Sequence, residues 1–213
     1  MIRALVVKEL RESAAVVALA AAYILAELWG VRLHPWSSAE PRGFSFFQDG
    51  FWDYLALLGP SLAIVLAMKQ TQWEDAKGTF PYLLFRPTTR REIFLLKLAV
   101  GGALVAGVTA LMILLHGVWA AVPGHQAFPF FWSMTIPSWQ LWFTLPLVYS
   151  AAFLCGVRPG RWYGSKLLPL VGGGALALIL CTQPWWWIAL VGSALGSAMC
   201  VGCALHVAAT RDY

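Results

Sequence analysis

Hydrophobic residues occur in long runs along the chain, separated by short polar stretches. Six runs are long enough to predict helices that cross a bilayer, since about 20 apolar residues span its hydrocarbon core. The predicted spans lie near residues 14–31, 51–68, 93–115, 139–157, 167–183 and 186–208. The pattern therefore predicts an all-α integral membrane protein that forms a single transmembrane domain over residues 1–213.

The first twelve residues, MIRALVVKELRE, are too polar to span a membrane and predict a helix that lies in its interface. Four apolar residues share one side of a helical wheel: Ile2, Leu5, Val6 and Leu10. Lys8 and Arg11 lie opposite, whereas Glu9 falls on the apolar side and makes the pattern imperfect. The run at 14–31 predicts an anchor and not a cleaved signal, because Glu9 and Glu12 interrupt the basic start of a signal peptide.

Basic residues are distributed unevenly among the segments that join the spans. With the N-terminus in the cytoplasm, 13 of the 15 Lys and Arg residues fall on the cytoplasmic side, and only Arg32 and Arg42 fall outside. Cytoplasmic loops carry this excess, so the sequence predicts six spans with both termini in the cytoplasm. The net charge of +5 then reflects topology and contact with anionic membrane lipid, and it does not indicate a nucleic-acid partner.

The composition agrees with a membrane protein. The chain is 60% hydrophobic and 12% charged, whereas roughly a quarter of the residues in a soluble domain are charged. Its 12 tryptophans suit a chain that meets both apolar and aqueous surroundings, since Trp gathers at membrane interfaces. The turn TQPWWW between the last two spans predicts such an interfacial belt on the outer side.

One densely charged stretch, WEDAKGTFPYLLFRPTTRREIFLLK at 73–97, includes most of the predicted cytoplasmic loop 69–92. Gly78 and Pro87 predict the two ends of a short helix in this loop, and Thr79 is its expected N-cap. Three residues form an apolar face on that helix: Phe80, Leu83 and Leu84. The loop is therefore expected to form a helical elbow at the membrane surface.

The elbow ends at TRRE, from Thr89 to Glu92, which has the pattern of a capping box at the start of the third span. An acidic start, an apolar face and a basic end suit a helix that docks into the groove of a soluble partner. The alternative is a connecting loop whose Arg residues only maintain the topology.

The same loop resembles that of the ABC-2 type transporter permeases, the membrane subunits of ATP-driven transporters. The family shows an acidic residue, Gly-Thr, two leucines, then Pro, a small residue, Arg, and a Lys in span three. Here these fall on Glu74, Gly78, Thr79, Leu83, Leu84, Pro87, Thr89, Arg90 and Lys97. In addition, Lys8–Leu10 resembles the family's N-terminal interface helix, and Arg211–Asp212 resembles its usual end.

The resemblance implies that the elbow is a coupling helix, which sits in a cleft of a separate ATPase and transmits its closure. The implied coupling residues are Glu74, Asp75, Gly78, Thr79, Phe80, Leu83, Leu84, Arg86, Pro87, Arg90 and Arg91, with Lys8 and Glu9 on the interface helix. It also implies two ABC ATPase subunits, a second permease subunit and a location in the bacterial inner membrane.

ATP and Mg are expected on the partner ATPase, with no cofactor on this chain. The sequence contains no G-x-x-x-x-G-K-[ST] phosphate loop, and GRWYGSK at 160–166 lacks the required spacing. Nothing resembles a catalytic triad, a paired-carboxylate site or the zinc motif H-E-x-x-H, so no catalytic or metal-ligating residues are predicted. The chain is expected to be a non-catalytic exporter subunit.

Two further features lie within the spans. Gly192 and Gly196 form G-x-x-x-G in the last span, which suits packing either between two permease subunits or within one. Glu27 is an intramembrane carboxylate in the first span, and such residues are candidates for gating or substrate contact. A partner such as Arg32 or Arg42 would instead make Glu27 structural.

A rival prediction is a membrane redox or haem-binding protein. His34, His116 and His125 are expected near the outer face, and Cys200 and Cys203 form C-x-x-C within the last span. Surface histidines and small-residue packing are the simpler explanations. A Soret band in the absorption spectrum would favour the rival, and a membrane scaffold that recruits a partner without transport is a third alternative.

Overall fold

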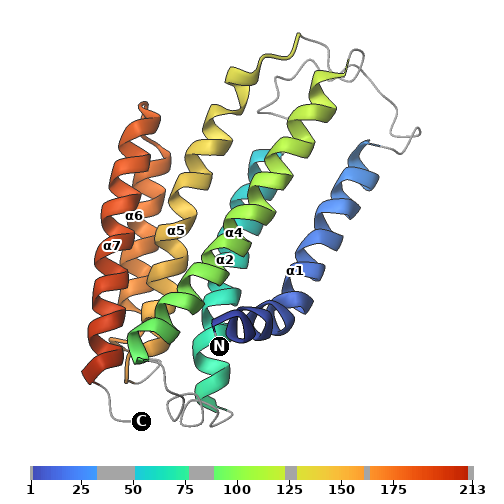
Figure 1. Ribbon diagram of the computed structural model, residues 1–213. Helices are drawn as coiled ribbons and strands as arrows, with labels where there is room; N and C mark the ends of the chain where they lie inside the picture. Colours follow the sequence, from blue (N-terminus) through green and yellow to red (C-terminus); the bar gives the residue numbers. More distant parts are fainter. Residues whose placement is uncertain (1, 33–50, 77–88, 123–128, 161–163, 211–213) are drawn as a thin grey trace.

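The chain forms a helical bundle in a computed structural model, which describes residues 2–32, 51–76, 89–122, 129–160 and 164–210 (Figure 1). The helices are α1 (Ile2–Arg32), α2 (Phe51–Ala76), α4 (Arg90–Ala121), a 3-10 turn η1 (Trp132–Thr135), α5 (Ile136–Val157), α6 (Leu168–Cys181) and α7 (Trp186–Thr210). Each of the six predicted spans coincides with one of the six α-helices in this described part of the chain. The described residues contain no strand, so the all-α class is confirmed.

Among the described residues, four stretches of helix are long and apolar enough to cross a membrane: Phe51–Trp73, Arg90–Ala121, Trp132–Val157 and Trp186–Thr210. They identify the chain as a membrane protein. α6 has 14 residues and is therefore roughly 21 Å long, shorter than a hydrocarbon core of about 30 Å. The helix count matches the predicted six, whereas six membrane crossings and cytoplasmic termini remain predictions.

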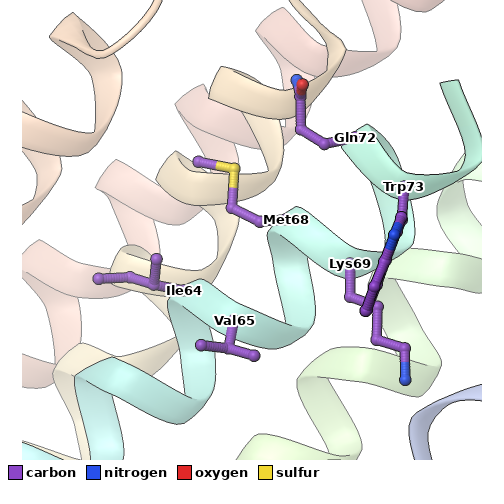
Figure 2. A pocket seen from close by; sticks show the side chains of 6 residues that line it. All are labelled: Ile64, Val65, Met68, Lys69, Gln72 and Trp73. Carbon is purple, nitrogen blue, oxygen red and sulfur yellow. The ribbon is translucent and has the colours of Figure 1, made fainter. Parts of the chain in front are cut away.

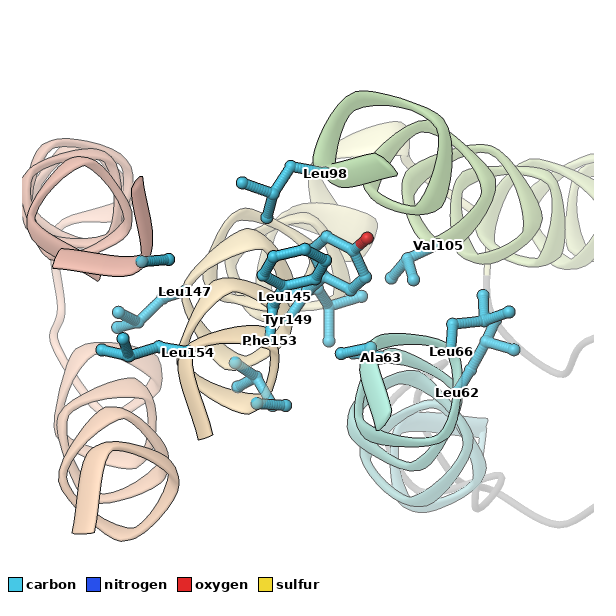
Figure 3. Close-up of a cluster of buried hydrophobic side chains, with 14 of the residues drawn as sticks. Leu62, Ala63, Leu66, Leu98, Val105, Leu145, Leu147, Tyr149, Phe153 and Leu154 are labelled. Carbon is cyan, nitrogen blue, oxygen red and sulfur yellow. The ribbon is translucent and has the colours of Figure 1, made fainter. Parts of the chain in front are cut away.

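α5 is the central helix of the bundle. Most of its residues are buried, and it packs against α2, α4, α6 and α7. Leu145, Tyr149 and Phe153 lie on its side facing α2 and α4, while Leu147 and Leu154 extend toward α6 and α7 (Figure 3). An almost uninterrupted apolar sequence explains this position, because a helix that is apolar on all sides can be covered on all sides.

α1 has two parts with different directions. Its N-terminal part lies across one end of the bundle, and the helix then turns to run along α4 (Figure 1). A helix in the membrane interface requires this transverse orientation. The end of α7 and the facing ends of α2 and α4 lie at the same end of the bundle.

α4 begins with the predicted capping box. The Oγ1 of Thr89 accepts a hydrogen bond from the backbone N of Glu92 at 3.3 Å, and Oε2 of Glu92 accepts one from the backbone N of Thr89 at 3.0 Å. This prediction is confirmed because the motif depends only on local geometry. The predicted coupling helix between α2 and α4 falls on residues 77–88, outside the described part of the chain.

α5 and α6 approach closely at Gly173, where an added Cβ would lie 2.6 Å from the Cβ of Ala151. Gly173→Ala is expected to cost about 1–3 kcal/mol, because overpacking forces the two helices apart. Gly172→Ala is the matched control, since its Cβ would meet nothing within 4 Å and alanine favours a helix more than glycine does. Thermal denaturation in detergent measures the difference, and equal stability of the two variants would contradict the predicted contact.

Candidate functional site

Glu9 of α1 and Lys97 of α4 form a buried ion pair near the end of the bundle where α1 begins. The Nζ of Lys97 lies 2.8 Å from Oε1 of Glu9, and each side chain is only 2% exposed. Removing a charge from water is costly unless an opposite charge and hydrogen bonds compensate for it. The pair explains why Glu9 faces the apolar side of its helix: its partner is in the protein interior.

Two further helices contribute to this site. Gln70 of α2 donates from Nε2 to Oε2 of Glu9 at 3.3 Å. The backbone carbonyl oxygen of Gln70 accepts a hydrogen bond from Nζ of Lys97 at 3.5 Å. Tyr149 of α5 donates from its hydroxyl to Oε1 of Gln70 at 2.5 Å, and this hydroxyl also lies 3.2 Å from the carbonyl oxygen of Lys97. Glu9, Gln70, Lys97 and Tyr149 are all buried, and together they form the buried polar cluster.

The backbone of α4 makes room for this cluster at Gly101. A Cβ at this position would lie 2.5 Å from Oε1 of Gln70 and would clash with the Tyr149 hydroxyl. Glycine therefore permits the hydrogen bond between Gln70 and Tyr149 by leaving space beside it. Without that space, Gln70 could not contact α1 and α5 at once.

The buried polar cluster lies near the end of α2 and the start of α4. Lys97 is seven residues after the start of α4 and Gln70 is six residues before the end of α2, so both lie roughly 10 Å from the helix ends that flank 77–88. Moving α4 away from α1 would separate the buried Glu9–Lys97 ion pair, which is energetically unfavourable. Moving α2 away would break the hydrogen bond from Gln70 to the buried carboxylate of Glu9. The cluster can therefore transmit displacement of these two helix ends to α1 and α5.

Neighbours of Gln70 provide more connections to the same helices. Lys69 donates from Nζ to the carbonyl oxygen of Glu12 on α1, and Gln72 donates from Nε2 to the carbonyl oxygen of Gly156 at 2.8 Å on α5. Three polar residues within four positions of α2, Lys69, Gln70 and Gln72, thus contact α1 or α5. The stretch QTQWEDAK begins at Gln70, so its first residues contact neighbouring helices.

The structure describes some of the residues that the sequence predicts for coupling. Lys8 lies beside Glu12, with its Nζ 3.7 Å from Oε1 in a solvent-accessible pair. Glu74 and Asp75 belong to the last turn of α2, but their side chains lie outside the described part. Arg90 and Arg91 are the first residues of α4, and Arg91 is exposed. The other predicted coupling residues lie outside the description: Gly78, Thr79, Phe80, Leu83, Leu84, Arg86 and Pro87.

Only Glu9 among the predicted site residues belongs to the buried polar cluster. Lys97 is part of the family resemblance but is not predicted as a partner of Glu9, and the sequence pattern does not predict Gln70 or Tyr149 as members of the site. One signal was present in the sequence: a lysine inside an apolar run and a glutamate on the apolar side of a helix. Two opposite charges at such positions indicate a buried pair.

The two glycines of the G-x-x-x-G motif face other helices of the same chain. A Cβ at Gly192 would lie 2.7 Å from Cδ2 of Leu180, and one at Gly196 would lie 2.8 Å from Cδ1 of Leu147. These glycines therefore serve packing of α7 against α5 and α6, as the intramolecular alternative requires. A dimer of two permease subunits would need a different surface.

Glu27, the candidate for gating or substrate contact, lies in α1, and its side chain is outside the described part of the chain.

The structure describes one histidine and two cysteines of the redox alternative. His116 is buried on α4 and stacks on Phe51, with ring centroids 3.8 Å apart, while His34 and His125 lie outside the described residues. Cys200 is half-buried and Cys203 exposed on α7, and both are free thiols. The described part of the chain contains no group of three or more His, Cys, Asp or Glu residues that could hold a metal ion.

The fold and site together define a helical membrane protein in which a buried polar cluster joins four helices near one end of the bundle. Comparisons with models of protein families, with curated proteins and with solved structures found no match. The sequence of the loop at 73–91 and the geometry of the buried polar cluster are therefore the observations that bear on function.

Proposed function

We propose that the chain is the permease subunit of an ATP-driven ABC-2 type transporter that works as an exporter. In this proposal the chain crosses the bacterial inner membrane six times, with both termini in the cytoplasm. The loop pattern from Glu74 to Lys97 supports it at the level of sequence. The observation that carries it most directly is the buried Glu9–Lys97 pair with its hydrogen bond from Gln70, because together they connect α1 to α4 and α2, the helices on either side of the proposed coupling loop.

The proposed mechanism starts outside this chain. ATP and Mg bind to two partner ATPase subunits, which close and displace the loop at 73–91. Since this loop joins α2 to α4, the displacement reaches both helices at their ends. The buried polar cluster then makes α1 and α5 move with them, because the alternative is to separate Glu9 of α1 from Lys97 and to break the buried hydrogen bonds of Tyr149 on α5. Such rigid coupling suits a switch between two packed arrangements.

A single chain of six helices is expected to form half of the permease. A second permease subunit, identical or related, supplies the other half, and substrate passes between the two. This chain has no phosphate loop, so ATP hydrolysis takes place on the partner and the permease itself is not an enzyme. Membrane lipid surrounds the assembly, and no nucleic acid takes part.

Purification of the tagged chain from its native membrane in mild detergent tests the proposal. Mass spectrometry is expected to identify an ATPase with a phosphate-binding loop, enriched over a purification from cells without the tagged chain. Absence of an ATPase even after chemical cross-linking would overturn the proposal. An absorption spectrum of the same sample, inspected for a Soret band, then tests the haem-binding alternative.

A further inference from the structure

Two adjoining hollows follow one side of α2. The first lies near the C-terminal end of α2 and has a volume of about 460 Å³. It is lined by Ile64, Val65, Met68, Lys69, Gln72 and Trp73 (Figure 2). The second has a volume of about 350 Å³ and lies between α2, α5 and α6, where its walls include Pro60, Ile64, Val148, Gly174, Ala177 and Leu178.

The two hollows adjoin at Ile64, which lines both of them, and together they are called the groove. Pro60, Ile64, Met68 and Gln72 follow one another every four residues, so a single ridge of α2 borders the whole groove. From Lys69 to Pro60 the helix rises roughly 14 Å. This is about half of a hydrocarbon core of ~30 Å, and therefore about the depth of one membrane leaflet.

Polar groups are concentrated at one end of the groove. The Nζ of Lys69 lies 5.6 Å from the ring centroid of Trp73, which is 57% exposed. Lys69 also donates to the carbonyl of Glu12, which uses one of the three N–H donors of an ammonium group. Lysine and tryptophan are typical of the membrane–water interface. Beyond them the walls are almost entirely apolar.

We propose that this groove binds one anionic phospholipid of the adjoining leaflet. The phosphate lies at Lys69, and one acyl chain follows Ile64 and Pro60 toward Gly174. Charge complementarity selects this occupant, because a cation at the mouth of an apolar groove favours a lipid with a negative headgroup. The assignment to the cytoplasmic leaflet rests on the proposed topology of the permease, whereas the groove and its charge do not.

Native mass spectrometry of the purified chain with added phosphatidylglycerol or phosphatidylcholine tests this site. Wild-type protein is expected to retain phosphatidylglycerol preferentially. Lys69→Gln is expected to weaken its binding about fivefold, as loss of one basic contact with an anionic lipid surface predicts. Arg158→Gln is the control, since it removes a cation from the same end of the bundle but outside the groove.

A second pair of variants tests the apolar part. Gly174→Leu is expected to weaken binding of both lipids, because its Cβ meets no atom within 4 Å and the side chain can extend into the groove that Gly174 lines. Gly172→Leu is its matched control on α6: its Cβ also meets nothing within 4 Å, and Gly172 does not line either hollow. Leucine is expected to fold normally at both positions, since it favours a helix over glycine.

Several outcomes would overturn the lipid site. One is equal retention of phosphatidylglycerol by wild type and Lys69→Gln, and another is equal loss in Gly172→Leu and Gly174→Leu. A dimer that Gly174→Leu dissociates, without any change in bound lipid, would assign the groove to a second copy of this chain. Lipid binding is measured without an ATPase, so its result is independent of the co-purification that tests the proposed function.

Discussion

Replacing Lys97 with methionine is expected to lower the free energy of unfolding by about 3–5 kcal/mol. Methionine replaces the apolar stem of the lysine but lacks its ammonium group, so it leaves the carboxylate of Glu9 buried without an opposite charge. Gln70 still donates a hydrogen bond to Glu9, but a neutral amide does not balance its charge. Denaturation of the purified protein in detergent measures the loss.

A double variant distinguishes the buried charge from simple loss of packing. Glu9→Gln combined with Lys97→Met is expected to recover most of the stability, because glutamine still accepts a hydrogen bond from Gln70 and no charge remains buried. Replacement of a buried ion pair by neutral groups is often close to neutral in energy, whereas removal of one partner is not. The pair of experiments thus separates the cost of an orphaned charge from the net contribution of the pair.

Lys8→Met provides the control for these variants. Lys8 is a neighbour of Glu9 in sequence, but its pair with Glu12 is accessible to solvent, and such pairs contribute no more than about 1 kcal/mol. Lys8→Met is therefore expected to remain close to wild type in stability. A Lys97→Met variant as stable as Lys8→Met would contradict a buried ion pair, as would a double variant no more stable than Lys97→Met.

Changing Glu74 and Leu83 together to arginine is expected to reduce recovery of the ATPase at least about tenfold. Residues at the centre of a docking interface each contribute about 2 kcal/mol or more, and every 1.4 kcal/mol changes affinity about tenfold. The two substitutions reverse a charge in the proposed coupling loop and place a second one on its apolar face. The ratio of ATPase to permease in the purified complex measures the effect.

Two controls show whether this loss belongs to the loop. Arg42→Glu reverses a charge on the opposite side of the membrane in the proposed topology, and it is expected to leave ATPase recovery unchanged. The variant Glu9→Gln with Lys97→Met retains the loop at 73–91 and is also expected to recover the ATPase. Undiminished recovery with the Glu74 and Leu83 double variant would remove the loop from the interface and refute docking at this place.

The positions of the helices follow from local features of the sequence. Long apolar runs predict the six α-helices that the structure describes, because an apolar run is a local feature and needs no information about neighbouring helices. The start of α4 was also predictable, because the capping box at Thr89 and Glu92 closes within four residues. The short α6, with 14 residues, shows the limit of this approach: apolar composition does not fix where a helix ends.

The sequence by itself thus determined an all-helical membrane protein, with a polar loop whose pattern resembles a coupling helix. Tertiary structure decided the partners of the charges, because Glu9 and Lys97 are 88 residues apart and periodicity carries no information about such pairs. It also decided that Gln70 and Tyr149 join them, and that Gly192 and Gly196 pack within the chain. Hydrophobicity selects which residues leave water, whereas the fold alone determines which buried groups meet.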